Sequence, residues 1–225
     1  MKRLIIARHG NTFTAEQTPT RVGRHTDLPL VEETLGRNIG RYLAEHQIHL
    51  SKVYAAPLQR TIRTAQLIIE ALPQSLPIIP INDFLEIDYG VDENQSEDRV
   101  IDRLGRYQLA LEGNDTPTTQ QIINAGKAII DRWNRSAQVP PGWQVDVHNI
   151  ISNWQNFANR IKDNETVLLV SSNGIIRFVP HLLGQAKYQQ FIQTQSLKVK
   201  TGSLAIFDYL ADSWQCTLWN ERPKY

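Results

Sequence analysis

Short runs of apolar residues alternate along the chain with longer segments in which apolar residues recur every three or four positions. A short apolar run without that period is typical of a buried strand, and the longer spacing is typical of a helix with one buried face. The pattern predicts strands at residues 4–7, 53–56, 78–81, 167–171, 204–209 and 215–219, and helices at residues 35–46, 59–72, 151–161 and 175–183. Strands that alternate with helices indicate a mainly parallel sheet with helices on both faces.

Residues 90–142 interrupt this alternation. The segment is polar and charged, has no clear strand pattern, and ends in the helix-breaking sequence Pro140-Pro141-Gly142. Its apolar residues are suited to packing on a larger core; they are Val100, Ile101, Leu104, Leu109, Leu111, Ile122, Ile123, Ile129, Ile130 and Trp133. We therefore predict an α/β fold of three layers, helix-sheet-helix, in which residues 1–225 form a single domain and residues 90–142 add a helical cap. A separate small domain is the alternative for that segment.

Composition narrows the classes of partner. Lys and Arg number 24 and Asp and Glu 23, a net charge of +1, so the chain has no overall attraction to nucleic acid or an anionic membrane, and any anion site must be local. Cys216 is the single cysteine, which excludes an intrachain disulfide and fits the reducing cytosol. The apolar run at residues 4–7 is too short for a signal peptide, and no run approaches the ~18 apolar residues of a membrane span. We expect a cytoplasmic protein with neither nucleic acid nor membrane as partner.

The sequence ARHGNT (residues 7–12) directly follows the first predicted strand. Ligands of open parallel sheets bind outside the carboxyl ends of the strands, so a site is expected here. His9 is suited to act as nucleophile or base. The Arg8 guanidinium suits phosphate and disfavours protonation of a neighbouring imidazole. Taken alone, an Arg-His pair that only stabilises a loop is an equally good interpretation.

A second basic sequence, APLQRTIRTA (residues 56–65), opens the helix predicted at residues 59–72. Arg60 lies in its first turn, where free main-chain N–H groups and the positive end of the helix dipole attract anions. Arg60 can therefore join Arg8 on one phosphate group. Arg63 is expected to be solvated or paired with an acid.

These two motifs, in this order, resemble those of the histidine phosphatase superfamily, also called the phosphoglycerate mutase-like family. The resemblance continues in GRHTDLPL (residues 23–30), FLEIDYG (residues 84–90) and LLVSSNGIIR (residues 168–177). It covers residues 3 to about 184. The resemblance implies the family's three-layer α/β fold.

The resemblance also implies a reaction. In the family the first histidine attacks phosphorus, water hydrolyses the resulting phosphohistidine, and a carboxylic acid protonates the leaving alcohol and then activates the water. His9 and Glu86 would take these parts, with Arg8 and Arg60 stabilising the phosphoryl charge. Glu86 must hold a proton while phosphate binds, and burial would raise its pKa toward that state.

The choice of Glu86 rests on its position four residues before Gly90, as in the family. A salt bridge that anchors the segment is the alternative role for this side chain. Four neighbouring carboxylates compete with it for the acid/base role: Asp83, Asp88, Asp92 and Glu93.

The chain departs from the family at Asn173, where most members have a second histidine. An asparagine still offers N–H donors to a phosphoryl oxygen but carries no positive charge. The loss of one charge-assisted bond predicts a rate lower by about ten-fold, in a slower rather than an inactive enzyme. The N–H of Gly174 is a further candidate donor to phosphate. An ordinary turn is the alternative for residues 171–174.

The sequence thus predicts a metal-independent phosphatase, without cofactor, that hydrolyses a small phosphate monoester. The alternative is a binding or regulatory protein that keeps the phosphate pocket but has little turnover because of Asn173. A phosphoglycerate mutase is disfavoured because the residues after Glu86 do not resemble that branch. Asn11 and Tyr89 are candidate substrate contacts, with a core position the alternative for Tyr89. The other histidines are not expected to bind metal; they are His25, His46, His49, His148 and His181.

Overall fold

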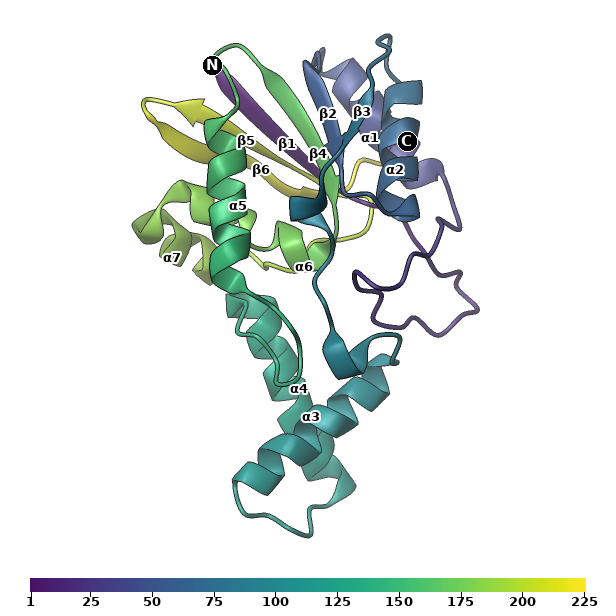
Figure 1. The fold of residues 1–225 in the computed structure, drawn as a ribbon, viewed down its shortest axis with the longest axis vertical. Helices are drawn as coiled ribbons and strands as arrows, with labels where there is room; N and C mark the ends of the chain where they lie inside the picture. Colours follow the sequence, from purple (N-terminus) through teal and green to yellow (C-terminus); the bar gives the residue numbers. More distant parts are fainter.

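The computed structural model describes residues 1–225 and is built on one six-stranded sheet in the order β3-β2-β4-β1-β5-β6 (Figure 1). The strands are β1 Lys2–Arg8, β2 Lys52–Ala55, β3 Ile78–Pro80, β4 Thr166–Ser171, β5 Leu204–Leu210 and β6 Ser213–Glu221. The first four run parallel to one another, and β5 and β6 join antiparallel. All six predicted strands are confirmed, and the sheet is mainly parallel.

The chain has seven α-helices: α1 Thr34–Glu45, α2 Gln59–Glu70, α3 Glu97–Leu111, α4 Thr119–Ser136, α5 Val147–Asn159, α6 Asn173–Ile176 and α7 Gln185–Thr194. The helices predicted at residues 35–46, 59–72 and 151–161 correspond to α1, α2 and α5. The prediction of one helix over residues 175–183 is wrong, because the chain forms α6 and then a separate 3-10 turn, Val179–Leu183. Pro180 lacks the N–H that a continuous helix needs and disfavours helical geometry in the residue before it.

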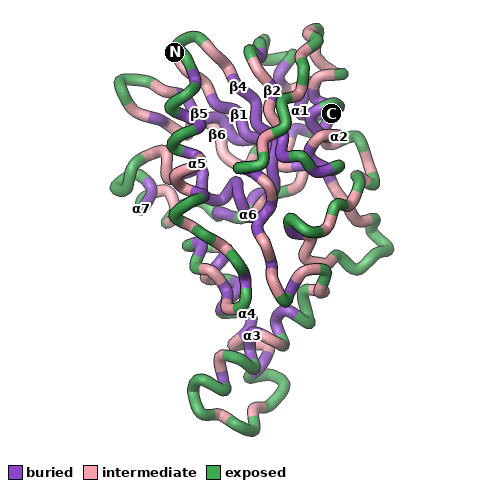
Figure 2. Tube along the Cα trace, in the orientation of Figure 1, coloured by how far each residue is buried: buried purple, intermediate pink, exposed green.

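The strands alternate their side chains between two faces, and each face has its own core. Ile5 and Ala7 of β1 belong to a cluster of 13 buried residues that includes residues of α1 and α2. Leu4 and Ile6 point the other way, into a cluster of 29 buried residues that includes Trp154 of α5. Figure 2 shows the buried sheet strands between these helical layers. The three-layer helix-sheet-helix prediction is confirmed.

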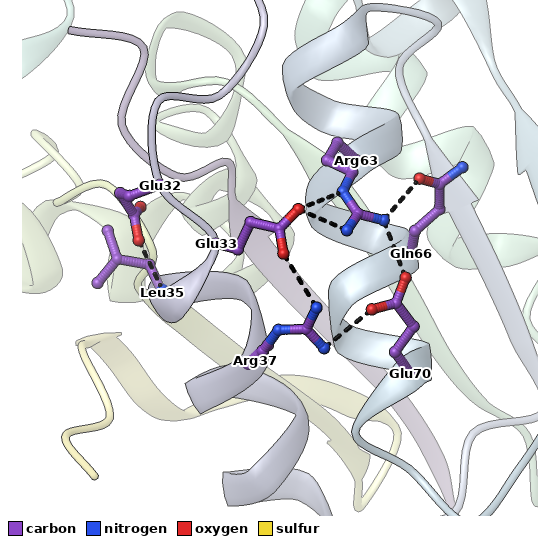
Figure 3. A network of polar contacts seen from close by, with 7 residues as sticks. All are labelled: Glu32, Glu33, Leu35, Arg37, Arg63, Gln66 and Glu70. Carbon is purple, nitrogen blue, oxygen red and sulfur yellow. Dashed lines mark hydrogen bonds and ion pairs between the residues drawn. The ribbon is translucent and has the colours of Figure 1, made fainter. Parts of the chain in front are cut away.

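Helices α1 and α2 are joined at the surface by a network of four ion pairs (Figure 3). Arg63 of α2 lies between Glu33, at 2.5 Å, and Glu70, at 2.9 Å, and Arg37 of α1 contacts the same two carboxylates at 3.0 and 2.9 Å. Of the two roles expected for Arg63, solvated or paired with an acid, the structure shows the second. Arg63 thus holds two helices together and takes no part in an anion site.

Within residues 90–142, α3 and α4 form a helical hairpin that projects away from the sheet (Figure 1). Its tip, the loop between the two helices, is exposed (Figure 2). Near its base, α4 places Ile129, Ile130 and Trp133 in the larger core cluster. Leu111, which was expected to pack on the core, is 68% exposed because it ends α3 at the tip. No helix of the structure combines the length and the apolar character needed to cross a membrane.

The two hairpin helices touch through their backbones at Gly126. A Cβ atom at this position would lie 2.0 Å from the main-chain oxygen of Ile101. We expect Gly126→Ala to lower the free energy of unfolding by about 1 to 3 kcal/mol, because the helices must separate to admit the methyl group. Urea denaturation measures the change, and Lys127→Ala, on the exposed side of α4, is the control. A Gly126→Ala protein as stable as the wild type would contradict this backbone contact.

Candidate active site

The site lies at the carboxyl edge of the sheet, where β1 and β4 end side by side. These strands are parallel neighbours in which Arg8 pairs with Ser171. The chain leaves β1 at His9 and leaves β4 toward Asn173, so both side chains start from the same edge. The main-chain N–H of His9 donates to Ser171 O at 3.1 Å and fixes this start.

His9 is 6% exposed and has a defined tautomer. Its Nδ1 lies 2.7 Å from the main-chain oxygen of Gly10. Because a carbonyl oxygen only accepts, Nδ1 must carry the proton, and Nε2 keeps the free lone pair. Burial, and then the charges of Arg8 and Arg60, hold the pKa of His9 well below its usual value. His9 is therefore neutral, with Nε2 in the form of a nucleophile.

The two predicted arginines have different surroundings. Arg8 lines the cavity described below, and its Nη1 donates to the main-chain oxygen of Val199. Arg60 is fully buried, and its Nη atoms donate to Thr26 O at 2.8 Å and Gly23 O at 3.1 Å. Arg60 is not among the residues that line the cavity, so its effect on the site is that of a nearby positive charge.

Glu86 is 4% exposed and is held by main-chain N–H groups. Its Oε1 accepts from Ile87 N at 2.8 Å and its Oε2 accepts from Gly174 N at 3.3 Å. Burial raises the pKa of Glu86, although both N–H groups and the charges of Arg60 and Arg8 act in the opposite direction. A carboxyl group with a raised pKa in the same cavity as a neutral histidine is suited to donate a proton.

Each competing carboxylate is engaged elsewhere or exposed. Asp88 accepts from Gly90 N at 2.7 Å and pairs with His25, Asp92 pairs with Arg103, and Asp83 is exposed. Glu93 accepts from the main-chain N–H of Gly23 and the hydroxyl of Thr26. Glu86 is the one member of these five that lines the cavity with His9.

Gly174 binds Glu86 through its main chain in this structure. Its N–H donates to the Glu86 carboxyl group, a contact different from the phosphate contact that the sequence suggested. A Cβ atom at Gly174 would lie 2.3 Å from Glu86 Oε1 and 2.7 Å from a side-chain carbon of Ile87. The glycine thus allows the start of α6 to approach the Glu86 segment closely.

Asn173 is oriented by the segment that precedes β5. Its Oδ1 accepts from the main-chain N–H of Val199 at 2.9 Å. Because the oxygen faces Val199, the Nδ2 group is the part of the amide left to donate elsewhere, and Asn173 lines the cavity. The side chain therefore positions a loop with one end and offers N–H donors with the other.

A cavity of 460 Å³ brings most of the predicted residues together. Arg8, His9, Asn11, Glu86, Tyr89 and Asn173 line it, whereas Arg60 and Gly174 lie outside its lining. Tyr89 is 5% exposed, and its ring packs edge-on against the ring of Trp143 with the centroids 4.7 Å apart. It is therefore a core residue that also reaches the cavity. Burial raises the pKa of Tyr89 to about 12, which keeps its hydroxyl neutral.

Other lining residues were missed from the sequence, among them Arg21, Asn134, Lys198 and Thr201. Lys198 and Thr201 precede β5, which runs antiparallel to β1 and so begins where β1 ends. That topology is the signal that could have found them. Thr201 also donates its hydroxyl to Asn11 Oδ1 at 2.7 Å, which fixes the amide of Asn11 at the cavity.

A family model of the histidine phosphatase superfamily (branch 1) matches residues 4–222. The chain belongs to this superfamily. A 2,3-bisphosphoglycerate-dependent phosphoglycerate mutase of Rhizobium meliloti (strain 1021) is 24% identical over 223 residues, and the match covers 93% of this chain and 91% of the mutase. The superfamily predicted from the motifs is confirmed.

Solved structures share the fold of this histidine phosphatase superfamily member. The phosphoglycerate mutase of Bacillus anthracis str. Sterne has a TM-score of 0.69 and 21% identity, covering 98% of this chain and 93% of that one. The α-ribazole phosphatase of Shigella flexneri has a TM-score of 0.65 and 19% identity, covering 99% and 98%. At these identities the similarity establishes the fold, and the reaction must be argued from the site.

The remaining histidines of this superfamily member lie outside the cavity. His25 pairs with Asp88 at 2.9 Å and its side chain is 63% exposed, as expected for a solvated loop residue. His181 stacks on Tyr188 with ring centroids 3.8 Å apart. No group of three or more His, Cys, Asp or Glu side chains is arranged to hold a metal ion.

Proposed function

We propose that this superfamily member is a metal-independent phosphatase that hydrolyses a small phosphate monoester through a phosphohistidine on His9. The observation that carries the proposal is the state of His9. Its Nδ1 donates a hydrogen bond to Gly10 O, which leaves a lone pair on Nε2, and its cavity is also lined by a buried carboxyl group with a raised pKa. Arg8 and the N–H donors of Asn173 bind the phosphoryl oxygens, and Arg60 stabilises their charge from behind. Residues 90–142 form a cap on a single domain, 1–225.

The proposed reaction has two displacements. The Nε2 lone pair attacks phosphorus, the ester P–O bond breaks, and the leaving oxygen takes the proton of Glu86. Water then attacks the phosphohistidine and gives a proton to the Glu86 carboxylate, and the P–N bond breaks. Phosphate leaves, and His9 and Glu86 return to their starting protonation states. Inside a buried site such fixed charges and donors act more strongly than they would in water.

The test is hydrolysis of a panel of phosphate monoesters with and without a chelator. We expect phosphate release that the chelator does not change. An absence of release across alkyl, aryl and sugar phosphates, with phosphate binding intact, would refute the phosphatase and favour the binding or regulatory protein.

A phosphoglycerate mutase is the second candidate, because a mutase is among the relatives. A mutase returns the phosphoryl group to an acceptor hydroxyl, whereas a phosphatase gives it to water. The two are separated by measuring 2- and 3-phosphoglycerate interconversion and phosphate release in the same sample. We expect release to exceed interconversion, and the reverse ratio would assign the mutase.

Asn173 gives a prediction on phosphate binding. Asn173→Asp keeps an oxygen that accepts from Val199 N but replaces the Nδ2 donor with a carboxylate oxygen. We expect kcat/KM to fall by about a hundred-fold, since a donor is lost and like charges repel. Asn134→Asp adds the same charge to the α4 side of the cavity and is the control. Equal losses of kcat/KM in both variants would indicate a long-range charge effect. Asn173 would then not be a ligand of the phosphoryl group.

A further inference from the structure

The segment between α7 and β5 places one lysine at the cavity. Leu197 and Val199 are 0% and 2% exposed and are anchored in the larger core, while Lys198 between them is exposed and lines the cavity. Because its two neighbours are fixed, the backbone of Lys198 is fixed relative to His9. Lys200, two positions on, is exposed and does not line the cavity.

Val199 connects this segment to Asn173, which follows β4, and to Arg8, at the end of β1. Its N–H donates to Asn173 Oδ1 at 2.9 Å, and its carbonyl oxygen accepts from Arg8 Nη1. These bonds hold both the N–H and the carbonyl group of Val199, so the segment cannot slide without breaking them. Lys198 is therefore held next to the residue where the chain departs from the family pattern.

The ammonium group of Lys198 has no partner within the chain. The hydrogen bonds of this residue are made by its main chain: its N–H donates to Ser196 Oγ at 3.1 Å, and its oxygen accepts from Asn220 Nδ2 at 3.2 Å. The other cations of the cavity are engaged, Arg8 with Val199 O and Arg21 with Glu97 at 2.5 Å. Lys198 is the cavity cation whose charged group is left without an internal acceptor.

We propose that Lys198 binds a phosphoryl oxygen in the cavity and supplies there the positive charge that Asn173 does not carry. The proposal rests on the part of the proposed function that places a phosphate group in this cavity. A lysine has a long flexible stem and three donors, so it can follow an oxygen as the phosphoryl group moves toward His9. Asn173 then has two functions, to donate to the phosphoryl group and to hold the Lys198 segment.

The test compares Lys198→Met with Lys200→Met, which removes the same charge from the same segment. Calorimetry with inorganic phosphate measures binding, and phenyl phosphate hydrolysis measures kcat/KM. We expect Lys198→Met to weaken phosphate affinity and to lower kcat/KM by about ten-fold each, Lys198→Arg to recover most of both, and Lys200→Met to stay within about two-fold. Phosphate affinity should also fall less steeply with added salt in Lys198→Met than in the wild type.

Inorganic phosphate has no leaving group, so its binding separates a phosphoryl contact from a contact to the rest of a substrate. Unchanged phosphate affinity in Lys198→Met, or an equal loss in Lys200→Met, would overturn the assignment of Lys198 and leave the phosphatase standing. A third outcome is that the wild type binds phosphate but hydrolyses no substrate, and that Lys198→Met loses the phosphate affinity. That outcome would support Lys198 as a phosphate ligand and refute the phosphatase.

Discussion

Replacement of His9 by alanine is expected to abolish phosphate monoester hydrolysis, with kcat/KM lower by about ten-thousand-fold or more. The reason is that Nε2 of His9 forms the bond to phosphorus in the proposed mechanism, and no other histidine lines the cavity. The Gly10 carbonyl leaves that nitrogen unprotonated, and burial with two neighbouring arginines keeps the pKa of His9 low. Steady-state hydrolysis of phenyl phosphate measures the loss.

His25→Ala is the matched control for this variant. His25 pairs with Asp88 at the surface, so its loss should leave turnover close to that of the wild type. Thermal unfolding of both variants shows whether the protein remains folded. Substantial hydrolysis by a folded His9→Ala protein would mean that water attacks phosphorus directly and that His9 only binds the phosphate.

Replacement of Glu86 by glutamine is expected to have an effect that depends on the leaving group. An alkoxide is a poor leaving group and needs the Glu86 proton, so kcat/KM for an alkyl phosphate should fall by about a thousand-fold. A nitrophenolate leaves without protonation, so the loss for nitrophenyl phosphate should be less than about ten-fold when formation of the phosphohistidine limits kcat/KM. The comparison of the two substrates in one variant is the measurement.

The raised pKa of Glu86 predicts the direction in which kcat/KM changes with pH. In the proposed mechanism the proton donor is the neutral carboxyl group of Glu86, and burial raises the pKa of this group. Its protonated fraction is full below that raised pKa and is lost as pH increases through it, so kcat/KM for an alkyl phosphate should decline toward alkaline pH. Glu86→Gln should lack this decline, and Glu97→Gln, which changes another carboxylate of the same cavity, should retain it. A similar loss for both leaving groups, or an alkaline decline that persists in Glu86→Gln, would remove the general-acid role.

The strands, and the edge of the sheet at which the site lies, could be predicted from the sequence. The strands follow from short apolar runs, and the edge follows from the general topology of parallel sheets. The buried runs in β1 and β4 are apolar without interruption, and parallel neighbours end at the same edge. That reasoning places His9 and Asn173 together with no knowledge of side-chain packing. Helix α7 escaped prediction because Tyr188 is its one buried residue, which leaves no apolar stripe in the sequence.

The contacts of individual polar groups depended on tertiary packing and could not be predicted. Arg60 has the position of a phosphate ligand in the sequence, yet two loop carbonyls take its Nη donors. Gly174 has the position of a phosphate donor, yet its N–H donates to Glu86. Buried donors are satisfied by whichever acceptor packing brings near, and sequence spacing does not specify that acceptor.

The chain is nearly neutral overall, but its cavity carries positive charge. A net charge of +1 gives no long-range attraction to polyanions. Within the cavity Arg8 and Lys198 add positive charge, Arg21 is balanced by Glu97, and Glu86 is driven toward its neutral form by burial. The charge is therefore concentrated where one small phosphate group would bind.

The proposed mechanism requires a covalent bond between phosphorus and His9. Rapid mixing of the enzyme with nitrophenyl phosphate, a quench in alkali, where phosphohistidine is stable, and peptide mapping by mass spectrometry test it. We expect a phosphoryl group on the peptide that contains His9, formed within one turnover and lost when substrate is exhausted. Continued turnover with an unmodified His9 peptide at every time point, or with the phosphoryl group on another residue, would contradict the mechanism.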